Sequence, residues 1–133
     1  MRQFLAACSV CALLAGPAAA DEGAIQGVIS DQLSAFIDDD FDAAFSHASP
    51  AIRQLFGTSQ RFGSMVRNGY PMVHRPQEVR FLDLRDVNGR LVQRLMITDA
   101  QGTLHMLDYQ MIETADGWRI NGVQIVRAPQ VGA

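Results

Sequence analysis

Residues 79–127 read VRFLDLRDV NG RLVQRLMIT DAQG TLHMLDYQMIET ADG WRINGVQIVR, and this stretch decides the fold. Four runs rich in β-formers with period-two alternation are separated by short breaks, of which Asn88-Gly89 is the clearest. Such breaks are typical of hairpin turns, and consecutive strands joined by hairpins pair most simply as an antiparallel meander. The sequence therefore predicts strands at Val79–Val87, Arg90–Thr98, Thr103–Thr114 and Trp118–Arg127.

The residues before this stretch carry a helical pattern. Apolar residues recur at spacings of three and four from Glu22 to Asp38, which indicates an amphipathic helix. Shorter helices are expected over residues 41–48 and 50–55, and a further one capped by Thr58 or Ser59 and ended by Asn68-Gly69. A short extra strand is expected at Met72–His74. Helices followed by a sheet place the chain in the α+β class, with helices packed across one sheet face.

An acidic run, Asp38-Asp39-Asp40, lies between the first two expected helices. Carboxylates satisfy free backbone N–H groups at a helix start and complement the positive end of its dipole. The alternative is a hard-cation site, but no calcium-loop spacing of ligands follows the run. We therefore expect these carboxylates to end one helix and cap the next.

The N-terminus has the pattern of a cleavable signal peptide. Arg2 supplies one positive charge, residues 4–15 form an uncharged apolar run of 12 residues, and Gly16-Pro17 breaks any helix. Ala18-Ala19-Ala20 then provides the small side chains that a signal peptidase requires. We expect residues 1–20 to be removed by cleavage after Ala20, which leaves a single domain over residues 21–133. The protein would be exported, and periplasmic in a Gram-negative cell.

Composition limits the chemistry of the mature chain. Cys8 and Cys11 are the only cysteines of the full sequence, and both lie in the removed segment. The mature chain would therefore have no disulfide, no thiolate catalysis and no cysteine metal site. Residues 5–8 resemble a lipoprotein acylation site, but almost no apolar segment precedes them, and no membrane anchor is expected. Loss of Arg2 leaves 10 basic and 14 acidic residues, a net charge near −4, which disfavours nucleic acid as a partner.

The expected strands carry apolar residues on both faces. In residues 90–98, Leu91, Leu95 and Ile97 lie on one face and Val92 and Met96 on the other. Antiparallel sheets with one solvated face alternate cleanly, and the helices can cover only one face. We therefore expect the other face to pack against a second copy of the sheet, which makes a homodimer.

The order of elements and the closing segment from Gly117 to Val123, GWRINGV, resemble the NTF2-like (SnoaL-like, cystatin-like) superfamily. More narrowly, residues 70–76 (YPMVHRP), 81–84 (FLDL) and 107–109 (LDY) resemble a family of short exported bacterial proteins with a domain of unknown function. The narrower resemblance covers nearly all of the mature chain. It implies a cone-shaped fold whose sheet and helices enclose a pocket, and it carries no activity, because the superfamily includes both enzymes and non-catalytic modules.

Enzymes on this fold use a buried acid or imidazole as general base beside a tyrosine or second acid. The catalytic candidates here are Tyr70, His74 and Asp108, and the ligand-binding candidates are Tyr70, His105 and Tyr109. Strand alternation places His105 and Tyr109 on one face and Asp108 on the other, so these three cannot all line one pocket. No metal or cofactor is expected, since the histidines lie in separate elements and the sequence has no phosphate loop or nucleophile elbow.

Three functional hypotheses remain open from the sequence. The first is a non-catalytic module that binds a small apolar ligand or an envelope protein. The second is an isomerase- or dehydratase-like enzyme, which requires a buried, pKa-shifted carboxylate or imidazole in an apolar cavity. The third is a purely structural dimer, which requires a cone filled by Phe and Met side chains. The balance favours the first.

Overall fold

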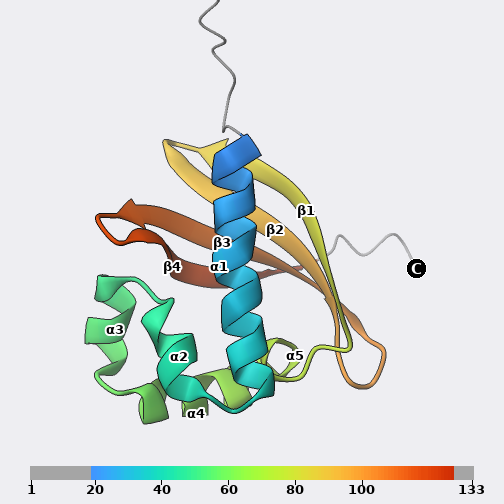
Figure 1. Cartoon of the computed structure of the whole chain (residues 1–133). Coiled ribbons are helices and arrows are strands. Elements are labelled where there is room, and N and C mark those ends of the chain that lie inside the picture. Colours follow the sequence, from blue (N-terminus) through green and yellow to red (C-terminus); the bar gives the residue numbers. More distant parts are fainter. Residues whose placement is uncertain (1–18, 128–133) are drawn as a thin grey trace, which may run out of the picture.

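A computed structural model describes residues 19–127, and it has five helices followed by four strands (Figure 1). Helices precede the sheet, which confirms the predicted α+β class. The predicted signal peptide falls almost entirely outside the described residues. The elements are α1 (Ala19–Ile37), α2 (Phe41–Ser46), α3 (Pro50–Phe56), α4 (Ser59–Gly69), α5 (Pro71–His74), β1 (Glu78–Val87), β2 (Arg90–Thr98), β3 (Leu104–Thr114) and β4 (Gly117–Val126).

The four strands form one antiparallel meander in the order β1-β2-β3-β4, as predicted. Asn88 and Gly89 have φ of 54° and 84°, the left-handed conformation that a two-residue hairpin turn requires. Register shifts interrupt the ladder between Phe81 and Leu84 and between Gln110 and Met111. Such irregularities bend a strand, and the sheet is curved and open (Figure 1).

Side-chain caps set the helix boundaries. Asp40 accepts a hydrogen bond from Ala43 N at the start of α2, which confirms the capping role predicted for the acidic run. Ser49 caps α3 and Thr58 caps α4 in the same way. Gly57 closes α3 with φ of 80°. Short polar signals therefore determine where these helices begin and end.

The strand predicted at Met72–His74 is wrong, because residues 71–74 form the helical turn α5. Pro71 occupies the first turn, where its fixed φ suits a helix and its missing N–H is not needed. Met72 and Val73 are both buried in the core. Three residues are too few for alternation to separate a strand from a single turn.

The helices lie on one side of the sheet, and α1 runs across the middle of that face (Figure 1). The core therefore lies between α1 and the inward side chains of the strands. Aromatic rings extend it under α4, where Phe36 and Phe62 stack with centroids 5.9 Å apart. The buried residues shared by α1 and the sheet are Ile25, Ile29, Leu33, Phe36, Leu95, Ile97, Leu107, Tyr109, Met111 and Ile120.

The outer face, opposite the helices, combines apolar and charged side chains. Val92, Met96 and Met106 point to this side, and so do Arg94 and Asp108, which lie directly opposite each other on neighbouring strands. Val92 is buried, whereas Met96 and Met106 are partly exposed. The face is less apolar than the sequence pattern indicated, because the ion pair of Arg94 and Asp108 lies among its apolar side chains.

Candidate functional site

A cavity of about 360 Å³ lies between the helices and the face of β3 and β4 that the helices cover. Every element of the helical half except α2 contributes to its wall. The lining is almost entirely apolar, and no charged side chain belongs to it among residues 19–127. The lining residues are Gln32, Phe36, Ala48, Ile52, Leu55, Phe56, Phe62, Met65, Val66, Tyr70, Val73, Tyr109, Ile120, Gly122 and Val123.

Tyr70 stands between α4 and α5 and reaches across the cavity wall to the sheet. Its hydroxyl donates a hydrogen bond of 3.2 Å to the Val123 carbonyl oxygen on β4. This contact fastens the corner between two short helices to the last strand. It therefore fixes one side of the cavity, and it leaves the phenol oxygen able to accept a further hydrogen bond.

Tyr109 forms the floor of the cavity on β3. The residue is 0% exposed, and its hydroxyl has no hydrogen-bond partner within the described part of the chain. Burial raises the pKa of this phenol above its ordinary value, and the nearby Tyr70 adds to the shift. Tyr109 is therefore an uncharged phenol at any physiological pH, with an unused hydrogen-bonding group.

Gln32 is a polar residue of the cavity that sequence reasoning missed. It is 3% exposed on α1, and its amide nitrogen donates a 3.1 Å hydrogen bond to the Ala44 carbonyl oxygen. A sequence signal existed, because Gln32 lies three residues after Ile29 and four before Phe36, on the apolar side of α1. A glutamine at such a position must bury its amide, and here that amide binds α2 and faces the cavity.

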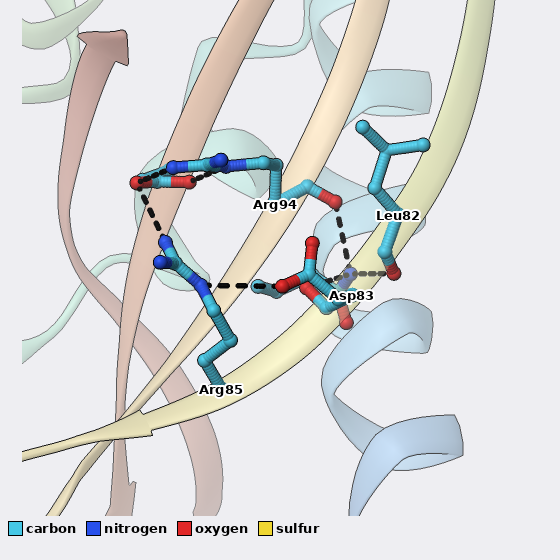
Figure 2. A network of polar contacts seen from close by, with 6 residues as sticks. Leu82, Asp83, Arg85 and Arg94 are labelled. Carbon is cyan, nitrogen blue, oxygen red and sulfur yellow. Dashed lines mark hydrogen bonds and ion pairs between the residues drawn. The ribbon is translucent and has the colours of Figure 1, made fainter.

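Gln93 is a second buried glutamine that the sequence did not single out. It is 0% exposed, and its amide nitrogen donates to the carbonyl oxygens of Leu82 and Arg94, both at 3.0 Å (Figure 2). These bonds satisfy backbone groups at the irregularity in β1, where the ladder is interrupted. Gln93 is paired across the sheet with Tyr109 but does not belong to the lining. Its role is to hold the bulge.

Asp108, a catalytic candidate, lies on the outer face and not in the cavity. Arg94 donates to its two carboxylate oxygens at 2.8 and 3.0 Å, and Arg85 adds a third bond of 3.1 Å (Figure 2). The hydrogen bonds from Arg94 and the charge of both arginines lower the pKa of Asp108. Arg85 Nε also lies 3.3 Å from an oxygen of Asp83. Asp108 is thus an anchored carboxylate and not a free base.

The two candidate histidines are engaged elsewhere. His74 Nε2 lies 2.8 Å from Asp39 Oδ1, and Arg75 binds both oxygens of the same carboxylate at 3.0 Å. These contacts tie α5 to the turn after α1, and they lower the pKa of Asp39. His105 Nε2 lies 2.8 Å from Asp99 Oδ2 at the hairpin between β2 and β3. Of the five candidate residues, the structure brings only Tyr70 and Tyr109 together.

A family model for a domain of unknown function, DUF4864, matches residues 18–133. This chain belongs to the DUF4864 family. The DUF4864 chain is also similar to a solved structure, that of the phospholipid-binding protein from Ralstonia solanacearum in complex with a phospholipid. The two share 17% sequence identity with a TM-score of 0.48, and the match covers 77% of this chain and 76% of the other. No curated protein matches the sequence.

Helix α3 borders the cavity of this DUF4864 domain and forms part of its mouth. Ile52, Leu55 and Phe56 line the cavity, yet α3 has no buried residue, and Leu55 is 73% exposed. The helix is attached at its start, where Ser49 Oγ donates a 2.8 Å hydrogen bond to Asn121 Oδ1. Further along the helix, Ile52 and Phe56 pack against the core, and the Phe56 ring lies edge-on to Phe62 with centroids 5.7 Å apart.

Between residues 19 and 127, no helix is long and apolar enough to cross a membrane. No group of three or more His, Cys, Asp or Glu side chains in the same range could hold a metal ion.

Proposed function

We propose that this chain is an exported, non-catalytic module that binds a small apolar ligand in the cavity between its helices and its sheet. The observation that carries the proposal is the cavity itself, at about 360 Å³ and with an apolar lining. Ligand pockets begin near 300 Å³, and a dry cavity of about 150 Å³ holds benzene. By that measure this cavity accommodates a ligand of roughly 10 to 15 non-hydrogen atoms.

The enzyme hypothesis receives less support than binding. A general base in the cone requires a carboxylate or imidazole in the lining, and among residues 19–127 the lining holds neither. Outside the cavity, His74 and His105 each contact an aspartate, and Asp108 is held by two arginines. The purely structural hypothesis requires a filled cone, and the cavity counts against it. The curved sheet, the helices on one face and the cavity between them also support the wider resemblance to the NTF2-like superfamily.

A neutral fluorescent probe tests the proposal. We expect 1-naphthylamine, a neutral probe within this size range, to bind the purified protein saturably with one site per chain and increased fluorescence. Met65→Trp would fill part of the cavity and weaken binding at least tenfold, whereas Met96→Trp, the same substitution on the outer face, would leave binding unchanged. Circular dichroism controls for folding. Absence of saturable binding, or equal binding by both variants, contradicts the proposal.

The outer face supports a second proposal, a homodimer formed through the sheet. Met96, Met106 and Ile112 give this face a partly exposed apolar component that no helix of the described chain covers. Light scattering after size-exclusion chromatography should give twice the chain mass, and Met106→Arg should reduce the mass to that of one chain. A wild-type protein that stays monomeric at high concentration rules out this dimer, and an envelope protein then becomes the partner to seek.

A further inference from the structure

The polar groups of the cavity are few, and each has a defined role. Gln32 Nε2 donates to the Ala44 carbonyl oxygen, so its amide oxygen must point the other way, because a flipped amide would bring two oxygens together. That oxygen accepts no hydrogen bond from the residues that the structure describes. Tyr70 uses its proton on Val123, and the Tyr109 hydroxyl is sealed in the floor. Two oxygens of the lining can therefore still accept a hydrogen bond, Gln32 Oε1 and the Tyr70 phenol oxygen.

None of the charged side chains of residues 19–127 lines this cavity. Arg85 and Arg94 bind Asp108 on the outer face of the sheet, and Arg75 binds Asp39 beside α5. A carboxylate placed in the cavity would lose its hydration with no cation in the lining to replace it, and it would face the oxygen of Gln32. The buried part of the ligand must therefore be uncharged.

Free acceptors call for a ligand that brings a donor. An ammonium group is charged, and an amide brings a carbonyl oxygen and an N–H group that both need partners when buried. An alcohol brings one O–H donor, which Gln32 Oε1 can accept. We infer that the ligand is an uncharged apolar alcohol whose hydroxyl donates to Gln32 Oε1 while its hydrocarbon part lies against the aromatic and aliphatic lining. This inference rests on the proposed binding function and names its ligand class.

Three probes of nearly equal size separate these requirements. 1-Octanol carries the donor, its isomer 1-methoxyheptane keeps the oxygen but has no donor, and octanoate carries a charge. Isothermal titration of the purified protein at pH 7.5 should show 1-octanol binding about five- to tenfold more tightly than the ether, the value of one hydrogen bond to a buried acceptor. Octanoate should bind at least tenfold more weakly than the alcohol.

Two variants test whether Gln32 is responsible for the preference for the alcohol. Gln32→Met keeps the length of the side chain but removes the acceptor, and the alcohol and the ether should then bind within about twofold of each other. Gln26→Met makes the same change on the same helix, at a residue outside the lining, and should keep the preference for the alcohol. If Gln32→Met fails to fold, the comparison of the three probes on the wild type still decides the ligand class.

The outcomes distinguish the two proposals. Equal affinity of the wild type for alcohol and ether, or tightest binding of octanoate, overturns the inference while the binding function stands. A preference for the alcohol that persists in Gln32→Met removes Gln32 from the role assigned to it. Failure of all three probes to bind would contradict the proposed function itself.

Discussion

At the scale of one residue, Tyr109 lowers the stability of the fold, because its buried hydroxyl has no hydrogen-bond partner among the described residues. A buried hydroxyl without a partner costs about 1 to 3 kcal/mol relative to one that is hydrogen-bonded. We predict that Tyr109→Phe raises the free energy of unfolding by about 1 kcal/mol, whereas Tyr70→Phe lowers it by about 1 kcal/mol because it removes the bond to Val123. Urea denaturation measures both changes, and a shift of both variants in the same direction would contradict this account.

Asp108 gives the sheet a predictable response to pH. Its folded-state pKa is lowered from 3.8, mainly by hydrogen bonds from Arg94, so the unfolded chain binds this proton more readily. The stability from the ion pair is therefore present above pH 3.8 and is lost as the pH falls through the lower, folded-state value.

Removing this carboxylate leaves Arg94 without its countercharge and leaves Arg85 only the exposed Asp83. We predict that Asp108→Asn destabilises the protein by about 1 to 2 kcal/mol at pH 7, less than for a fully buried pair because Arg85 is partly exposed. The control Asp83→Asn removes a carboxylate with 57% side-chain exposure and should cost at most about 0.5 kcal/mol. Thermal unfolding at pH 7 compares the two, and equal losses would refute the assigned role of Asp108.

The sequence correctly predicted which face of the sheet a strand residue occupies, because side chains alternate between the two faces along a strand. Alternation placed His105 and Tyr109 opposite Asp108, and the register of β2 with β3 confirms it. Alternation gives no information about position along a strand, and His105 lies at the hairpin end beside Asp99, away from the cavity. Gln32 was missed because a single glutamine within an apolar helix face has the same sequence signature whether it binds a backbone or a ligand.

At the scale of elements, two helical glycines should respond in opposite ways to substitution by alanine. A Cβ at Gly63 on α4 would lie 2.6 Å from the Phe41 ring, while a Cβ at Gly27 on α1 would have nothing within 4 Å. Alanine gains about 0.5 to 1 kcal/mol over glycine in a helix, and overpacking costs about 1 to 3 kcal/mol.

We therefore predict that Gly27→Ala stabilises the protein by about 0.5 to 1 kcal/mol and that Gly63→Ala destabilises it by about 1 kcal/mol. Thermal or urea unfolding of the two variants provides the test. Stabilisation by Gly63→Ala would show that Phe41 can move away without loss of stability. It would also show that α2 and α4 are less closely packed than the structure indicates.

Strands and most helices were predictable because their boundaries are set locally. Asn88-Gly89 fixes one hairpin through positive φ, and Asp40 and Ser49 cap helices through their own side chains. Helix α5 was not predictable in this way. Four residues give no period, and burial of Met72 and Val73 against the core, a tertiary effect, determines their conformation.

The whole molecule carries a prediction about processing. We expect the exported protein to begin at Asp21, because cleavage after Ala20 would remove the apolar N-terminal run together with the two cysteines. Helix α1 begins at Ala19, so this cleavage would shorten it by two residues and leave Asp21 and Glu22 in its first turn, where carboxylates are favourable. Intact mass and N-terminal sequencing of the exported protein check this. Retention of residues 1–20 would refute it.

The cavity belongs to the scale of the whole molecule: the family resemblance implied a pocket, but the periodicity of the sequence could not predict it. Its wall combines Gln32 on α1, Tyr70 after α4 and Tyr109 on β3, which are distant along the chain. Periodicity shows which side of each element faces inward. It does not show whether the inward side chains meet or leave a space, because that depends on the separation of the layers.

The central claim is that this space accepts a ligand, and a methyl NMR titration tests it most directly. With 1-octanol as the probe, we predict saturable shifts for the methyl groups of Ile52, Val66 and Val73, which line the cavity, and none for Val92 or Ile112 on the outer face. Unchanged cavity methyl groups at the highest soluble concentration of the probe, or shifts confined to the outer face, would contradict the account.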